Sequence, residues 1–139
     1  MSDRETLAAL VARCEAATEA DRQLDADISV TIYGGEIVWK QSVTGEAWPH
    51  RRYASKAHIG GFGRAPVEPV TASLDAAVTL VPEGWRWEVH WQSESRSAAL
   101  VQPFGQVHWA TLRQASADTP ALALCAAALR ARMEEMSDA

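Results

Sequence analysis

The residues with the clearest chemical potential lie in one segment, residues 50–64, with the sequence HRRYASKAHIGGFGR. The segment contains four of the chain's 13 Lys and Arg residues and no Asp or Glu, although the whole chain has a formal net charge of −5. Arginine can bind phosphate oxygens through two parallel hydrogen bonds. Glycine lets backbone N–H groups approach a phosphate closely. The segment therefore predicts a site for a small anionic ligand, and a nucleotide fits its composition best.

The candidate ligand-binding residues are of three kinds: cations for phosphates, aromatic rings for stacking on a base, and one neighbouring imidazole. They are Arg51, Arg52, Lys56 and Arg64; Trp48, Tyr53 and Phe62; and His58. The glycine run at 60–63 matches neither a P-loop nor a dinucleotide-binding fingerprint. The alternative interpretation is a solvated surface loop whose charges only aid solubility.

Motifs for catalysis and for metal binding are missing from the sequence. His50, His58, His90 and His108 show no HxxH, HxH or HExxH spacing, and the two cysteines form no CxxC pair. No serine lies in a GxSxG elbow. We therefore expect a protein that is not an enzyme, with no catalytic residues, no metal and no cofactor. Paired strands could still bring two histidines together as acid and base.

Six tryptophans are a second notable feature, and three of them lie in one short segment. In residues 85–91, Trp85, Trp87 and Trp91 alternate with charged or polar residues, which predicts a half-buried strand. Large aromatic side chains on one strand face most often pack a sheet against helices. The alternative is an exposed aromatic platform for a base or a protein partner, and Trp109 would extend it.

The elements that must position these residues can be predicted from hydrophobic spacing, helix caps, glycine and proline. We expect helices at 4–18, from Asp21 to Gly34, from Thr71 or Ser73 to Val81, and from Thr119 to about Met133. We expect strands at 36–43, 85–91, 97–103 and about 107–111. Gly and Pro residues predict a long irregular basic loop over about 44–72.

These elements predict one α+β domain over residues 1–139. It would be a layered α-β-α structure, with a three- to four-stranded, mainly antiparallel sheet and flanking helices. The length of 139 residues and the 47% hydrophobic content suit a single packed core. Cys14 and Cys125 fall on apolar helix faces and are expected to be reduced core thiols.

The overall charge and hydropathy indicate which classes of partner and which cellular compartment to expect. A sequence pI of about 5.3 argues against binding bulk nucleic acid through the overall field. No signal peptide and no run of about 18 apolar residues is visible. We therefore expect no membrane association and a cytoplasmic location.

Several segments carry a resemblance to a known family. They are residues 71–85 (TASLDAAVTLVPEGW), 119–129 (TPALALCAAAL), the opening helix at Leu7–Cys14 and the DRQLD segment at 21–25. Together they resemble the phage ABA sandwich domain family of small phage and prophage proteins. The resemblance implies an α-β-α layered fold and a phage origin, and it carries no catalytic residues.

Taken together, these features predict a non-enzymatic phage accessory protein that binds a small anionic ligand. Such a protein could sequester a host nucleotide immune signal and so act against host defence. A second subunit often completes a pocket of this kind, so we expect a homo-oligomer. Two alternatives stay open: a protein-interaction module that docks on a host or phage protein, and a module similar to double-stranded-RNA-binding domains.

Overall fold

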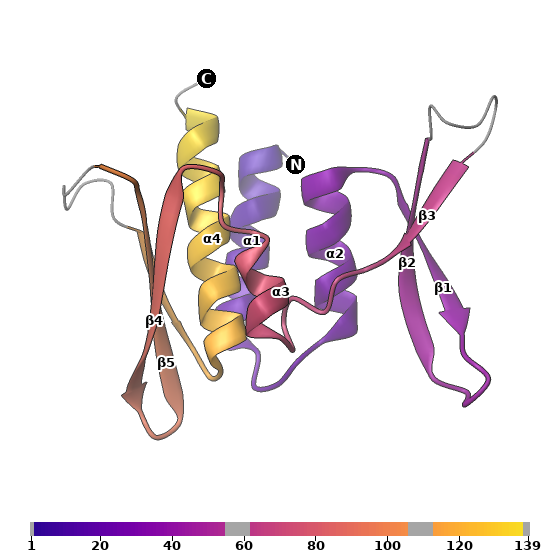
Figure 1. The fold of residues 1–139 in the computed structure, drawn as a ribbon, viewed down its shortest axis with the longest axis horizontal. Coiled ribbons are helices and arrows are strands. Elements are labelled where there is room, and N and C mark those ends of the chain that lie inside the picture. The colour runs from indigo at the N-terminus through magenta and orange to yellow at the C-terminus, as the bar shows by residue number, and fades with distance from the viewer. Residues whose placement is uncertain (1, 55–61, 106–112, 138–139) are drawn as a thin grey trace. The chain divides into compact units, whose positions relative to one another are not determined.

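The computed structural model describes residues 2–54, 62–105 and 113–137, and these residues form four helices and two three-stranded antiparallel sheets (Figure 1). The predicted α+β class, with antiparallel strands and flanking helices, is confirmed. Contacts group the chain into two compact units, Met1–Asp21 with Pro69–Ala139 and Arg22–Glu68. The single domain expected over residues 1–139 stays a prediction, and each unit is described by itself.

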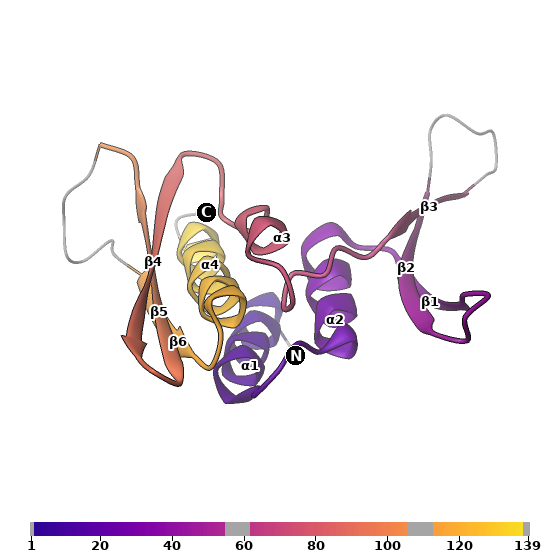
Figure 2. The ribbon, with the colours of Figure 1, turned by 60° about the horizontal axis from the view of Figure 1, so that its bottom comes forward.

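The first unit joins three helices to one sheet. Its elements are α1 (Asp3–Ala16), α3 (Leu74–Val78), β4 (Trp85–Ser93), β5 (Arg96–Pro103), β6 (Arg113–Ala117) and α4 (Pro120–Ser137). The strand order is β4-β5-β6, and α4 lies along one face of the sheet with α1 beside it (Figures 1 and 2). The strand expected at about 107–111 falls outside the described residues, and the third strand of this sheet begins at Arg113.

Helix α4 begins where its sequence signals predict. The Thr119 Oγ1 accepts a hydrogen bond from the Leu122 N–H at 3.2 Å, and Pro120 occupies the first turn, where it needs no N–H partner. Every residue from Ala121 to Leu129 is buried. The many alanines let the helix backbone approach its neighbours closely. Cys125 is buried there outside any disulfide, as expected, and its Sγ donates to the Val70 carbonyl at 3.1 Å.

The second unit corrects the predicted irregular loop at 44–72. It contains α2 (Arg22–Tyr33), β1 (Glu36–Gln41), β2 (Ala47–Ala54) and β3 (Phe62–Pro66), with strand order β1-β2-β3. Pro49 is tolerated in the central strand because its carbonyl accepts from the Val67 N–H at 3.0 Å. In an antiparallel pair the N–H and C=O of one residue point to the same neighbouring strand, so the missing N–H of Pro49 is on the β3 side. The β2–β3 pairing ends there, and no hydrogen bond between β2 and β1 is lost.

Two glycines in this unit serve close packing rather than loop flexibility. A Cβ on Gly63 would lie 2.5 Å from the ring of Tyr53, its partner across the β2–β3 pair. A Cβ on Gly35 would lie 2.3 Å from the carbonyl oxygen of Arg52. Gly63, one of the glycines that predicted the loop, thus lets an aromatic ring pack closely, and Gly35, at the turn before β1, does the same for a strand backbone.

Candidate functional site

The β1–β3 sheet carries a group of basic side chains on one face, which we call the basic face. Strand alternation places Trp48, His50 and Arg52 of β2 on this face, opposite the face that contains the buried Pro49. The strand register adds Lys40 from β1, which is paired with Trp48, and Arg64 from β3, which is paired with Arg52. Three strands therefore present cations on a common surface.

At the centre of the basic face, Arg52 lies between two cross-strand neighbours, Glu36 and Arg64. The Nη1 of Arg52 lies 3.3 Å from Oε1 of Glu36; the Glu36 side chain is exposed and that of Arg52 is partly buried. Arg64 is exposed, and no hydrogen bond or ion pair of its side chain is seen within the described residues. Two arginines directly opposite each other repel, so this pair favours an anion between them.

Arg51 lies on the opposite face from Arg52, together with Tyr53. Its guanidinium carbon lies 4.7 Å from the centre of the Tyr53 ring and 5.4 Å from that of Tyr33. It also donates long hydrogen bonds, of 3.5 and 3.4 Å, to the carbonyl oxygens of Tyr33 and Gly34. These contacts give Arg51 a structural role at the end of α2.

Trp48 is held by a residue that the sequence analysis did not single out. Its indole Nε1 donates to the carbonyl of Val67 at 3.3 Å, and the guanidinium of Arg22 lies 4.2 Å from the ring centre. Arg22 also donates to Glu46 Oε1 and to the Ala47 carbonyl, each at 2.6 Å. Arg22 therefore occupies one face of the indole, and a stacking base would have to use the other.

The structure thus divides the predicted ligand-binding residues between two faces. It brings Arg52, Arg64 and Trp48 to the basic face, and it places Arg51 and Tyr53 on the other. Lys56, His58 and the side chain of Phe62 lie outside the described residues. Lys40 was missed in the sequence because it lies outside segment 50–64; only the β1–β2 register brings it near.

A second surface with exposed chemistry lies on β4. The register pairs Trp87, Val89 and Trp91 with the fully buried Val101, Ala99 and Ser97 of β5. The tryptophans therefore point to the face of the sheet that α4 covers, and the Trp85 Nε1 donates to Glu135 of α4 at 3.1 Å. Yet Trp87 is 41% exposed and Trp91 is 73% exposed.

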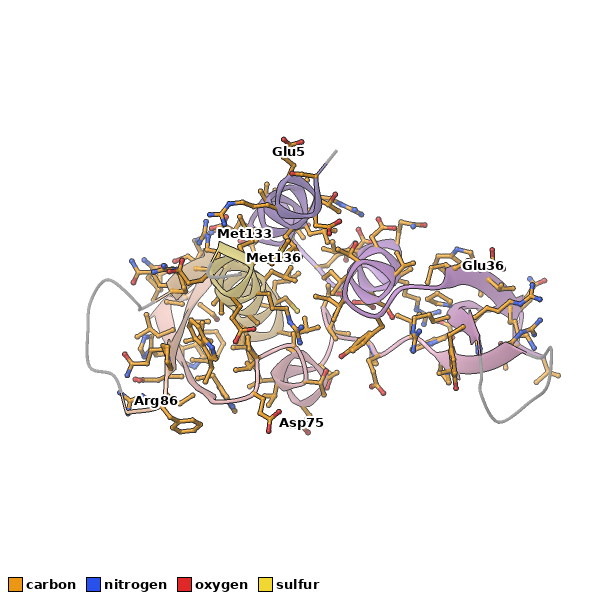
Figure 3. The ribbon with its side chains drawn as sticks, turned by 90° about the horizontal axis from the view of Figure 1, so that it is seen from above. Glu5, Glu36, Asp75, Arg86, Met133 and Met136 are labelled. Carbon is orange, nitrogen blue, oxygen red and sulfur yellow. The ribbon has the colours of Figure 1, made fainter. Side chains whose placement is uncertain are left out.

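This exposure follows from the position of β4 at the edge of its sheet. Helix α4 packs mainly on β5 and β6 and contacts β4 much less. Figure 3 shows the side chains of this unit, with Arg86 labelled on β4 and Met133 and Met136 on α4. The expected packing against a helix therefore applies in part to Trp85, which is half-buried beside α4, whereas Trp87 and Trp91 are exposed. His90 and His108 are the two histidines that paired strands could bring together, and His108 lies outside the described residues.

Two other kinds of site, a ligand pocket and a metal-binding cluster, have less support in the described residues. Ala20, Leu74 and Pro120 help to line a pocket of about 350 Å³ near the start of α4, but none of its lining residues is charged. In the described ranges, no group of three or more His, Cys, Asp or Glu side chains is arranged to hold a metal ion. None of the helices in those ranges is long and apolar enough to cross a membrane.

Comparison with known proteins adds no relative. No protein-family model matches the chain, and neither a curated protein nor a solved structure matches it significantly. The resemblance to the phage ABA sandwich domain family therefore stays a prediction.

Proposed function

We propose that the chain binds a small anionic ligand bearing phosphate, such as a nucleotide, on the basic face of the β1–β3 sheet. The observation that carries the proposal is the cross-strand pair of Arg52 on β2 and Arg64 on β3, with Glu36 on the far side of Arg52, on β1. An anion seated between the two guanidinium groups would relieve their repulsion and accept several charge-assisted hydrogen bonds.

Neighbouring side chains support a ligand larger than phosphate alone. His50 extends the face along β2, Lys40 extends it onto β1, and the indole of Trp48 is held by Val67 and Arg22. A fixed aromatic ring beside a cationic surface suits a nucleobase attached to a phosphate. In this proposal the protein binds the ligand and does not catalyse a reaction on it. Sequestration of a host nucleotide signal by a phage protein fits it, on the strength of the sequence resemblance.

Isothermal titration calorimetry tests the proposal, with ATP, cyclic di-AMP and inorganic phosphate as probes. Each arginine–phosphate contact contributes roughly 1.5–3 kcal/mol. Arg52→Ala and Arg64→Ala should therefore each weaken nucleotide binding by about tenfold or more. Arg86→Ala, which removes one exposed arginine from the other sheet, is the matched control. Equal affinities for Arg64→Ala and Arg86→Ala would contradict the proposal.

The second candidate is a protein-interaction module, and the exposure of Trp87 and Trp91 favours it. Salt distinguishes the two candidates. Affinity for a protein partner at the tryptophans would depend on apolar burial and change little with salt, whereas affinity for an anion at the exposed basic face would fall as salt screens the charges. Trp91→Ala should abolish binding to such a partner and leave nucleotide binding unchanged.

A further inference from the structure

Strand β4 is an unusual edge. Proteins usually protect edge strands by making them short, or with lysine or proline. The other three edges follow this practice: β1 carries Lys40, β3 ends at Pro66, and β6 has only five residues. Strand β4 has nine residues, with exposed tryptophans beside the charged Arg86 and Glu88 and a register irregularity only after Trp91; within the described residues its strand partner is β5 alone. A long, aromatic, unpaired edge is suited to pairing with another strand.

The sequence of β4 identifies the strand that fits. Residues 87–91 read Trp-Glu-Val-His-Trp, which is nearly palindromic about Val89. An antiparallel pair of two such strands, related by a twofold axis at Val89, places each Trp87 opposite the second copy's Trp91 on one face. On the other face it places each Glu88 opposite a His90. The apolar and the polar positions are therefore both self-complementary in this one register.

We infer that β4 pairs antiparallel about Val89 with β4 of a second copy of this chain, joining two three-stranded sheets into one of six strands. The exposed side chains agree with this arrangement. Trp87 and Trp91, 41% and 73% exposed, would cover each other beyond the reach of α4. Glu88 and His90 are also exposed, and within one strand the His90 Nδ1 lies 3.4 Å from Oε1 of Glu88. In the paired strands each Glu88 carboxylate would also face the imidazole of the second copy's His90. An isologous twofold contact of this kind closes on itself and stops at a dimer.

A pair of β4 strands whose twofold axis lies two residues nearer Gly84 lacks the match of tryptophan with tryptophan and of glutamate with histidine. It would centre on Trp87 and place Arg86 opposite Glu88, but Trp91 would face Glu83 and stay without an aromatic partner. Only the register about Val89 matches both tryptophans and both polar residues. This inference rests on the β4 edge alone and is independent of the anion-binding proposal.

Sedimentation velocity of the full chain over a range of concentrations tests the inference. The wild type should sediment as a dimer that dissociates on dilution. Trp91→Lys should raise the dimer dissociation constant at least tenfold, because it places a charge in the aromatic cluster. Phe104→Lys is the matched control: Phe104 is an exposed aromatic residue outside β4, and its replacement should leave the dimer intact.

A charge swap tests the register itself. Glu88→Lys and His90→Glu should each weaken the dimer, and the double variant Glu88→Lys/His90→Glu should restore it. Both residues are exposed, so these changes should leave the far-UV circular dichroism spectrum unchanged. A wild type that is monomeric at every concentration would overturn the inference, as would a Trp91→Lys variant that dimerises like the wild type. Failure of the double variant to recover would overturn the proposed register.

Discussion

The two sheets have the same strand number and the same meander pairing, yet they expose different chemistry. The β1–β3 sheet presents Lys40, Arg52 and Arg64 on one face. The β4–β6 sheet presents Trp87 and Trp91 at one edge. A guanidinium pair suits a small anion, whereas an aromatic edge suits another protein surface. The proposed ligand binding and the proposed self-association would therefore use separate surfaces.

The physical origin of the difference lies in what covers each strand. Helix α4 buries Ala99 and Val101 of β5 completely but contacts β4 little, so the aromatic side chains of β4 lack cover. On the basic face, the side chains are long and charged and can stay hydrated without a covering helix. Four substitutions, taken in order of decreasing change in stability, test this comparison.

Leu129→Ala should have the largest effect on stability, because Leu129 is fully buried on the helix that covers the β4–β6 sheet. Deletion of a buried leucine side chain costs about 2–5 kcal/mol in the free energy of unfolding. Met136→Ala is the control on the same helix, since Met136 is 39% exposed and should cost much less. Urea unfolding measures both. Equal losses would mean that α4 does not provide the core of its unit.

Gly63→Ala should destabilise the β1–β3 sheet, although alanine usually replaces a strand glycine at no cost. Its Cβ would lie 2.5 Å from the Tyr53 ring, and overpacking of this kind costs roughly 1–3 kcal/mol. In the Tyr53→Ala background the same substitution should cost far less, which a double-mutant cycle measures as a coupling energy. Additive effects would show that the ring does not pack over Gly63.

Thr119→Ala should lower stability by about 1 kcal/mol, because it removes the cap that accepts from the Leu122 N–H. Thermal unfolding measures the change. Thr119→Ser keeps the accepting hydroxyl and should retain most of the stability. If Thr119→Ser lowered stability as much as Thr119→Ala, the lost stability would come from the threonine methyl group and not from the capping hydrogen bond.

Arg64→Ala should have the smallest effect on stability, and its sign is informative. Without ligand, removal of one of two facing arginines should raise the unfolding free energy by about 0.2–1 kcal/mol at low salt. The gain should shrink at high salt, where surface charges are screened. Glu36→Gln, which removes the carboxylate beside Arg52, should change stability in the opposite direction. A loss of stability for Arg64→Ala at low salt would contradict the repulsion on which the site depends.

The sequence was a good guide where local signals agreed with one another. Thr119 followed by Pro120 predicted the start of α4, and the alternation of Trp85 to Trp91 predicted β4. It failed at residues 44–72, where glycine and proline usually break strands. There Gly63 accommodates the ring of Tyr53, and Pro49 meets the end of a strand pairing, so tertiary contacts outweighed local propensity.

The candidate site was predictable in composition but not in geometry. The concentration of positive charge in 50–64 is visible in the sequence, yet the face that each residue occupies depends on β2 being a strand. Alternation then separates the neighbours Arg51 and Arg52, which a loop would have allowed to act together. The contribution of Lys40 depends on a cross-strand register that a linear pattern does not contain.

Native mass spectrometry with ATP or cyclic di-AMP tests the separation of the two surfaces most directly, because one spectrum reports both ligand occupancy and oligomeric state. The wild type should appear as a dimer with bound nucleotide. Arg64→Ala should stay dimeric and lose the nucleotide, whereas Trp91→Lys should become monomeric and keep it. Loss of nucleotide from Trp91→Lys, or its retention by Arg64→Ala, would contradict the assignment of ligand binding to the basic face alone.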